Sequence, residues 1–114
     1  MTVRIAIAGA GLIGRRHAAA VSVASGASLA SIVDPSEVGG EVAARHGVPH
    51  FRSLEEMIAR DRPDGVILAT PNQHHADGAL ECIAAGLPVL IEKPLASDLA
   101  GAEKVGRVHI AEAL

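Results

Sequence analysis

Three glycines near the amino terminus have the spacing of a phosphate-binding turn. Gly9, Gly11 and Gly14 follow an apolar run, residues 3–8, that is typical of a strand. In a strand-turn-helix unit the first glycine permits the tight turn, the second lets the backbone approach a pyrophosphate, and the third lets the helix pack on its strand. A helix starting near Leu12 and Ile13 would point unpaired N–H groups and the positive end of its dipole at that place. The pattern predicts a dinucleotide site that includes both residues.

An acidic residue completes this pattern after the second apolar run. Asp34 directly follows residues 29–33. A carboxylate at this position can accept hydrogen bonds from the hydroxyls of a ribose. The same carboxylate repels a phosphate, and Pro35 and Ser36 follow it instead of an arginine. We therefore expect NAD as the cofactor, with NADP less favoured although Ser36 could tolerate its phosphate.

Polar residues also follow the fourth predicted strand, in the segment Ala69-Thr70-Pro71-Asn72-Gln73-His74-His75. Ligands of open α/β sheets bind beyond the carboxyl ends of the strands, so this segment is expected to line the cleft. A purely structural role explains two of these residues, because Pro71 ends a strand ladder and Asn72 can cap a helix. The two histidines do not predict a metal site, because adjacent helical residues point in different directions and no acidic or cysteine set completes the ligands.

The fifth predicted strand ends in Glu92-Lys93-Pro94, at the same edge of the sheet. A lysine there can bind a substrate oxygen, or can take part in proton transfer if burial lowers its pKa. A surface Glu-Lys pair before a proline turn explains the same residues equally well. The spacing alone does not decide between these two interpretations.

Strand-like runs alternate with helical segments along the chain, which favours a doubly wound parallel sheet of about five strands. Two of the runs, 66–69 and 89–91, are continuously apolar, as expected of strands covered on both faces. The predicted strands are 3–8, 29–33, 50–51, 65–70 and 88–92. The predicted helices are 12–24, 36–46, 53 to about 61, 73–85, and one that begins at 97 or 98. Ser53 and Glu56 form a capping box, Gly86 ends the fourth helix, and Gly39 and Gly40 each weaken the second by about 1 kcal/mol.

Composition excludes several classes of protein. The 114 residues, 49% hydrophobic and 20% charged, fit one globular domain, and the apolar runs are too short to cross a bilayer. Because no secretory signal precedes the first strand, we expect a cytoplasmic location. A net charge of −3 and a single aromatic residue, Phe51, argue against nucleic acid as a partner. The lone Cys82 is expected to be a core residue.

Together these residues resemble the amino-terminal half of the Gfo/Idh/MocA oxidoreductases. The similarity covers nearly the whole chain. The glycine motif is shared with many dehydrogenases, whereas the two later segments at these distances are more specific. The motifs that carry the resemblance are Gly9-Ala10-Gly11-Leu12-Ile13-Gly14 with His17, Asp34, the segment from Ala69 to His75, and Glu92-Lys93-Pro94.

The resemblance implies a Rossmann-like sheet of order 3-2-1-4-5 with helices on both faces. It implies that Asp34 holds the adenosine ribose, that Lys93 is the catalytic lysine, and that His17 is a packing position. The other residues that would border the cofactor are Gly9, Gly11, Gly14, Thr70, Pro71, Asn72, His75 and Glu92. The implied reaction is hydride transfer between NAD(P) and a sugar, cyclitol or related hydroxyl-bearing substrate.

The chain departs from this family in one respect, because family members continue into a second domain that binds substrate and supplies proton-transfer groups. We expect residues 1–114 to form one dinucleotide-binding domain, inactive alone, that takes a hydroxylated substrate only when a second domain is supplied. A stand-alone nucleotide-sensing module remains the alternative, and a methyltransferase fits less well because Glu92-Lys93-Pro94 would have no role. Exposed apolar surface should also drive self-association into a homo-oligomer.

Overall fold

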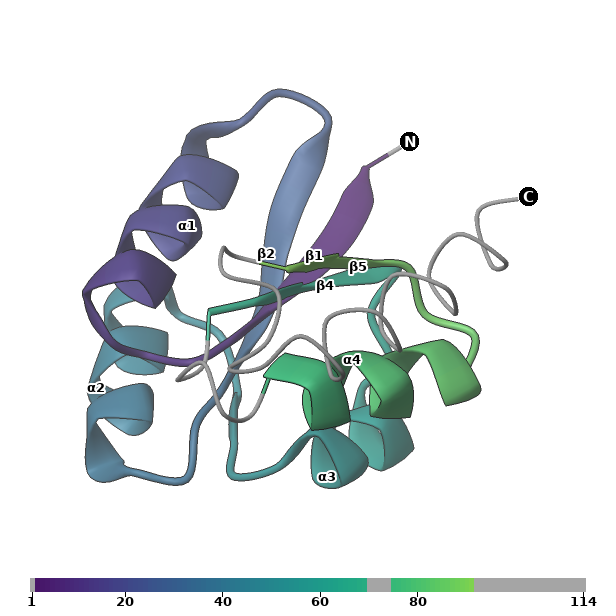
Figure 1. Ribbon diagram of the computed structural model, residues 1–114. Helices are drawn as coiled ribbons and strands as arrows, with labels where there is room; N and C mark the ends of the chain where they lie inside the picture. Colours follow the sequence, from purple (N-terminus) through teal and green to yellow (C-terminus); the bar gives the residue numbers. More distant parts are fainter. Residues whose placement is uncertain (1, 70–74, 92–114) are drawn as a thin grey trace.

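The computed structural model describes residues 2–69 and 75–91, which form a five-stranded parallel sheet with helices on both faces (Figure 1). The strand order is β3-β2-β1-β4-β5, so the predicted fold class and strand order are confirmed. The strands are β1 (Val3–Ala8), β2 (Ala27–Val33), β3 (His50–Phe51), β4 (Gly65–Leu68) and β5 (Val89–Ile91). The helices are α1 (Leu12–Val23), α2 (Glu37–His46), α3 (Leu54–Arg60) and α4 (His75–Ala84).

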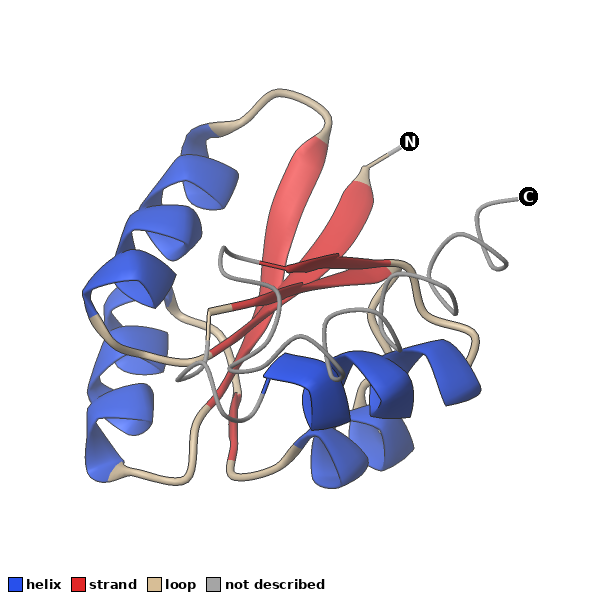
Figure 2. Ribbon diagram, in the orientation of Figure 1, coloured by secondary structure: helices blue, strands red, loops and turns tan. Residues whose placement is uncertain are grey.

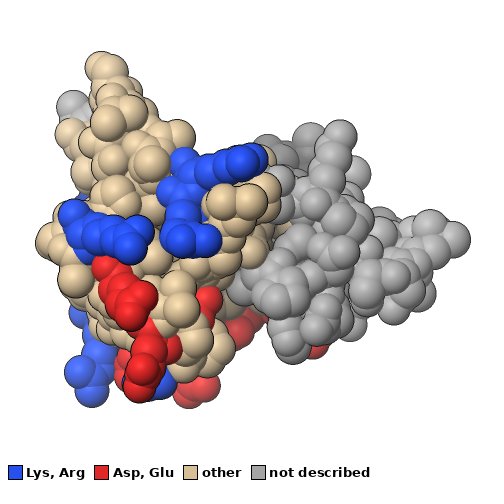
Figure 3. Space-filling model, turned by 90° about the vertical axis from the view of Figure 1, so that its left-hand side faces the viewer, with Lys and Arg blue, Asp and Glu red and all other residues tan. Residues whose placement is uncertain are grey.

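Helices α1 and α2 cover one face of the sheet and α3 and α4 cover the other (Figure 2), and a separate layer of buried side chains lies on each face. Because side chains alternate along a strand, Ala6 and Ala8 of β1 face α3 and α4, whereas Ile7 faces α1 and α2. The first layer also holds Cys82, which is fully buried as predicted. Figure 3 shows the outer surface of α1 and α2, where basic and acidic side chains lie close together.

The carboxyl ends of four strands are level with one another. In the parallel register Ala8 of β1 pairs with both Val33 of β2 and Leu68 of β4, and Leu68 pairs with Ile91 of β5. The backbone beyond these pairs stays aligned, because the amide of Gly9 donates to the carbonyl of Val33 at 2.7 Å. This edge therefore places the glycine turn beside the ends of β2 and β4.

Within the described residues the predicted elements are present, with small differences at their ends. Strand β2 begins two residues earlier than predicted, at Ala27, because it continues to pair with Val3 of β1. Strand β4 ends at Leu68, before the predicted 70, and β5 does not include Pro88, which has no N–H for the ladder. Helix α2 begins after Ser36, which is its N-cap. The predicted helix after residue 97 lies outside the described residues.

Two further expectations need correction. The Ser53 hydroxyl accepts from the amide of Glu56 as predicted, but the Glu56 carboxylate accepts from the amide of Arg52, one residue before the N-cap. On β5, Leu90 is 60% exposed, so within the described residues this strand is not covered on both faces. The left-handed Gly86 does end α4 as predicted, with φ of 76°.

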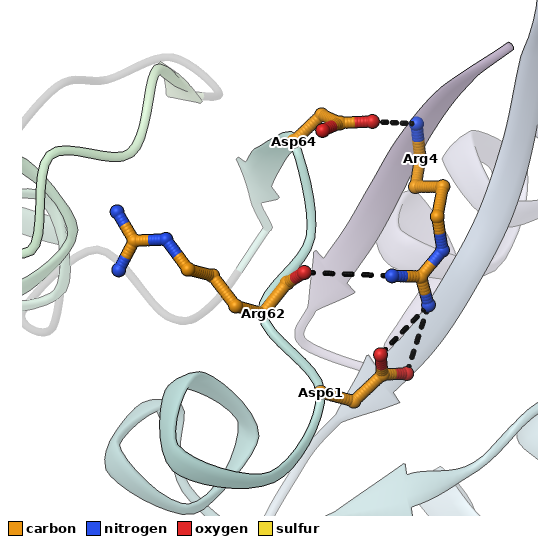
Figure 4. Close-up of polar contacts among 4 residues, drawn as sticks. All are labelled: Arg4, Asp61, Arg62 and Asp64. Carbon is orange, nitrogen blue, oxygen red and sulfur yellow. Dashed lines mark hydrogen bonds and ion pairs between the residues drawn. The ribbon is translucent and has the colours of Figure 1, made fainter.

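Two arginines tie together three chain segments at the opposite edge of the sheet, and Figure 4 shows the contacts of Arg4 with the loop before β4. The Arg4 guanidinium donates to both carboxylate oxygens of Asp61 at 2.9 Å and to the carbonyl of Arg62 at 3.4 Å. The Arg4 amide donates to the Asp64 carboxylate at 2.8 Å, and the amide of Asp64 donates back to the Arg4 carbonyl. Arg62 in turn donates to the carbonyl of Ala85 after α4. The cluster connects β1 to the loops before β4 and β5.

We expect the Arg4–Asp61 pair to stabilise the fold only modestly. The two side chains are 42% and 29% exposed, and solvent-screened pairs contribute roughly 0.2–1 kcal/mol. A double-mutant cycle with Arg4→Met and Asp61→Asn, followed by urea unfolding, should return a coupling energy in this range. Arg60→Met, at the exposed end of α3, serves as the control. A coupling energy of zero would show that the ion pair does not stabilise the fold.

Candidate functional site

The three glycines of the turn meet three different steric demands. Gly9 has φ of 108°, a conformation that side chains disfavour. A Cβ atom on Gly14 would lie 1.8 Å from the carbonyl oxygen of Gly9, so only glycine allows α1 to pack this closely. Gly11 has no neighbouring atom within 4 Å of such a Cβ, so the space above it is open. The geometry therefore confirms the tight turn expected at Gly9 and the close helix packing expected at Gly14.

Helix α1 begins at this turn, and no side chain of the described residues caps its first backbone amides. Its N-cap is Gly11, which has no side chain to accept from them. No acidic residue lies in the first turn of the helix. The amides and the helix dipole together favour an anion at this place.

Asp34 connects the glycine turn to the start of α2. One carboxylate oxygen accepts from the amide of Ala10 at 2.8 Å. The other accepts from the amide of Ser36 at 2.8 Å and from its hydroxyl at 2.5 Å. The sequence predicted an acceptor for a ribose but not these internal partners, which fix the carboxylate against the turn. A carboxylate has about four acceptor positions, so capacity for a ribose hydroxyl remains.

The same contacts keep Asp34 ionised. Partial burial alone would raise the pKa of the carboxyl, but donation from the Ser36 hydroxyl, the Ser36 amide and the Ala10 amide outweighs it. Nearby His50 adds a smaller effect in the same direction, and the resulting pKa lies below the usual 3.8. Asp34 is therefore a fixed negative charge at neutral pH.

A groove of about 480 Å³ runs over the turn and past Asp34. The apolar side chains along it are unusually open to solvent, since Leu12 is 58%, Ile13 42% and Val38 44% exposed. Val38 was missed by the sequence analysis because its place depends on how α2 approaches α1. The residues that line the groove are Gly9, Ala10, Gly11, Leu12, Ile13, Asp34, Ser36, Val38 and Ala69.

A second cavity, of about 540 Å³, lies on the α3 and α4 side and shares Asp34 with the groove. Arg52, which follows β3, lines it and donates from its guanidinium to the carbonyl of Pro35 at 2.9 Å. Sequence reasoning missed Arg52, although its position after a strand at the same edge was a usable signal. The other lining residues are Ala8, Val33, Ser53, Leu54, Leu68, Asp77, Gly78 and Glu81.

The remaining site predictions have different outcomes. Arg15 and Arg16 are exposed on α1. His17, on the same helix, is partly buried. His75 is the first described residue of α4. Thr70, Pro71, Asn72, Glu92 and Lys93 lie outside the described residues. Within the described part of the chain, no group of three metal-ligating side chains comes together and no helix is long and apolar enough to span a membrane.

The sheet order, the glycine turn at the start of α1 and the acidic residue after β2 define a Rossmann domain that binds NAD. Residues 3–112 match the model of the oxidoreductase family with an NAD-binding Rossmann fold. The chain belongs to this Gfo/Idh/MocA oxidoreductase family.

Individual relatives agree with this assignment. The chain is 44% identical over 104 residues to a 4-carboxy-2-hydroxymuconate-6-semialdehyde dehydrogenase of Sphingobium, covering 90% of this chain and 33% of that protein. It is 39% identical over 106 residues to an inositol 2-dehydrogenase of Leifsonia xyli, covering 90% and 31%. Among solved structures, GenD2 from gentamicin A biosynthesis in complex with NAD superposes with a TM-score of 0.91 at 32% identity, covering 99% and 33%. The chain thus spans about a third of the length of these relatives.

Gly14→Ala and Gly11→Ala should separate packing from ligand binding. The first places a Cβ against the backbone of Gly9, so we expect a loss of several kcal/mol in unfolding free energy, of the order of an overpacked core. The second meets open space, so stability should change by less than about 1 kcal/mol while NADH binding weakens. Thermal unfolding and calorimetric titration with NADH measure both. Equal effects of the two variants on stability would contradict the packing role of Gly14.

Asp34→Asn should remove a contribution to stability that depends on pH. Because the folded-state pKa is lowered, the contribution is complete above the unfolded-state pKa and is lost as the pH falls through the folded-state value. The difference in unfolding free energy between wild type and variant should therefore be constant between about pH 5 and 7 and should shrink below about pH 4. Urea unfolding at several pH values measures it. A difference that grows on acidification would contradict the lowered pKa.

Proposed function

We propose that this chain is the NAD-binding domain of a dehydrogenase that transfers hydride between NAD and a carbon atom bearing a hydroxyl group. The observation that carries the proposal is Asp34, whose carboxylate is held against the glycine turn at the carboxyl edge of the sheet. The family and its relatives support the reaction class. A sugar, a cyclitol or a related hydroxylated compound is the proposed substrate.

The two cavities suggest how the cofactor lies. In this proposal the first amides of α1, beside the groove above Gly11, would hold the pyrophosphate, and the Asp34 carboxylate would accept hydrogen bonds from the adenosine ribose. Leu54 and Leu68 of the second cavity would offer apolar contacts to the adenine. Arg52 lines this cavity, and its guanidinium could stack on the adenine ring. A carboxylate at the ribose favours NAD over NADP.

The reacting end of the cofactor is proposed to lie over the ends of β4 and β5. Leu68 and Ile91 pair at that edge, and the segments 70–75 and 92–93 adjoin these strands in sequence. NAD, when bound there, would supply the acceptor for a hydride from the substrate carbon. Lys93 is proposed to bind the substrate oxygen and, in its neutral form, to take the hydroxyl proton. Thr70, Pro71, Asn72, His75 and Glu92 are proposed as cofactor contacts.

Efficient turnover is proposed to require more than these residues. Hydride transfer needs a substrate held against the nicotinamide and a positioned acid or base. The chain corresponds to about a third of its relatives, and the rest of their length is the proposed source of the substrate pocket. We therefore propose that residues 1–114 form the dinucleotide-binding domain of such an enzyme.

We expect the purified chain to bind NADH with a dissociation constant between roughly 1 μM and 1 mM, the usual range of cofactor and substrate affinities. NADPH should bind at least about tenfold more weakly, because the Asp34 carboxylate repels its 2′-phosphate. Isothermal titration calorimetry measures both affinities. No heat of binding from folded protein would contradict the cofactor site, and steady NAD reduction with inositol by this chain alone would contradict the need for further residues.

A further inference from the structure

His50 occupies an unusual position beside the proposed ribose site. It begins β3, where it pairs with Ile32 of the neighbouring strand β2. Its imidazole Nε2 lies 2.8 Å from the carbonyl oxygen of Asp34. A carbonyl oxygen only accepts, so Nε2 carries the proton and donates to Asp34. The ring thus reaches from β3 across the end of β2 to the residue proposed to hold the ribose.

The two glycines of α2 make room for this ring. A Cβ atom on Gly39 would lie 2.8 Å from His50 Nε2 and 2.7 Å from the Asp34 Cβ, closer than real Cβ atoms approach. A Cβ atom on Gly40 would lie 3.3 Å from His50 Nδ1. Both glycines weaken a helix, and the sequence offered no reason for them. The imidazole packed against them supplies that reason.

With His50 in place, every polar group of Asp34 has a partner. Its amide donates to the carbonyl of Phe51 at 2.9 Å, and its carbonyl accepts from His50. Its carboxylate accepts from Ala10 and Ser36. Without the imidazole the carbonyl would lose its partner, and the space beside Gly39 would let Asp34 and the start of α2 shift. The other contacts come from the backbone of Phe51 and Ala10 and from Ser36, whereas His50 contributes a side chain from β3.

We propose that His50 is a positioning residue, which fixes the Asp34 carboxylate in the orientation that accepts the ribose hydroxyls of NAD and rejects the 2′-phosphate of NADP. The proposal rests on the proposed function, because it assumes that Asp34 meets the ribose. His50 acts through Asp34 and does not itself contact the cofactor.

The test compares His50→Gln with His50→Asn in calorimetric titrations with NADH and NADPH. The Gln amide can reach the Asp34 carbonyl, whereas the Asn amide is one methylene shorter and cannot. We expect His50→Gln to keep the NADH affinity within about twofold, and His50→Asn to lose about fivefold, the equivalent of one hydrogen bond. The NADPH affinity should change much less, so that the preference for NADH falls in the Asn variant only. His46→Asn, at the other end of α2, is the matched control and should change neither affinity.

Asp34→Ala, alone and combined with His50→Asn, tests the ribose role of Asp34 separately from the positioning role of His50. If Asp34→Ala leaves the NADH affinity unchanged, the proposed ribose role of Asp34 is wrong. If it weakens NADH but the Gln and Asn variants of His50 behave alike, or lose NADH and NADPH affinity equally, the positioning role of His50 is overturned. In the Asp34→Ala background His50→Asn should have no further effect on NADH affinity. If His50→Asn does not fold, the same comparison is made between His50→Gln and His50→Leu, with the same outcomes decisive.

Discussion

The contact between Gly14 and the carbonyl oxygen of Gly9 determines where the rest of the site can be. With no side-chain atom between them, the first turn of α1 lies directly against the end of β1, and the helix axis points its amino terminus at the carboxyl edge of the sheet. Any other residue at Gly14 would push the helix away from the strand. The groove, the open amides and the exposed side chains of Leu12 and Ile13 all follow from this close approach.

The carboxylate of Asp34 fixes the glycine turn relative to the turn that follows β2. Because it accepts from Ala10 on one side and from Ser36 on the other, it joins the β1–α1 turn to the β2–α2 turn. These are the two turns that a dinucleotide would bridge. A negative charge held by backbone amides is rigid before any ligand arrives, so little ordering is left for binding to accomplish. The site is thus built into the connections between strands.

The sequence predicted features that depend on local spacing or on strand order. The glycine turn, the strands, the caps at Ser53 and Gly86 and the sheet order could all be read from short patterns or from the family resemblance. The partners of Asp34 could not, because they depend on how β3 and α2 approach β2. His50, Arg52 and Val38 reach the site from segments that carry no recognisable motif, so only the folded arrangement reveals them. The predicted start of β2 and the predicted end of β4 were wrong for the same reason, because pairing with β1 decides where each strand begins or ends.

The reactivity of the buried Cys82 thiol can report on local opening of the folded protein. Burial, and to a lesser degree the neighbouring Glu81, raises its pKa to about 12, so in the closed protein it is both shielded and protonated. A thiol in this state does not react with alkylating reagents. Modification therefore requires α4 to separate from the sheet, and its rate measures the free energy of that opening. Since α4 also supplies one wall of the cavity next to Asp34, a ligand bound there would slow the alkylation of a cysteine that it never touches.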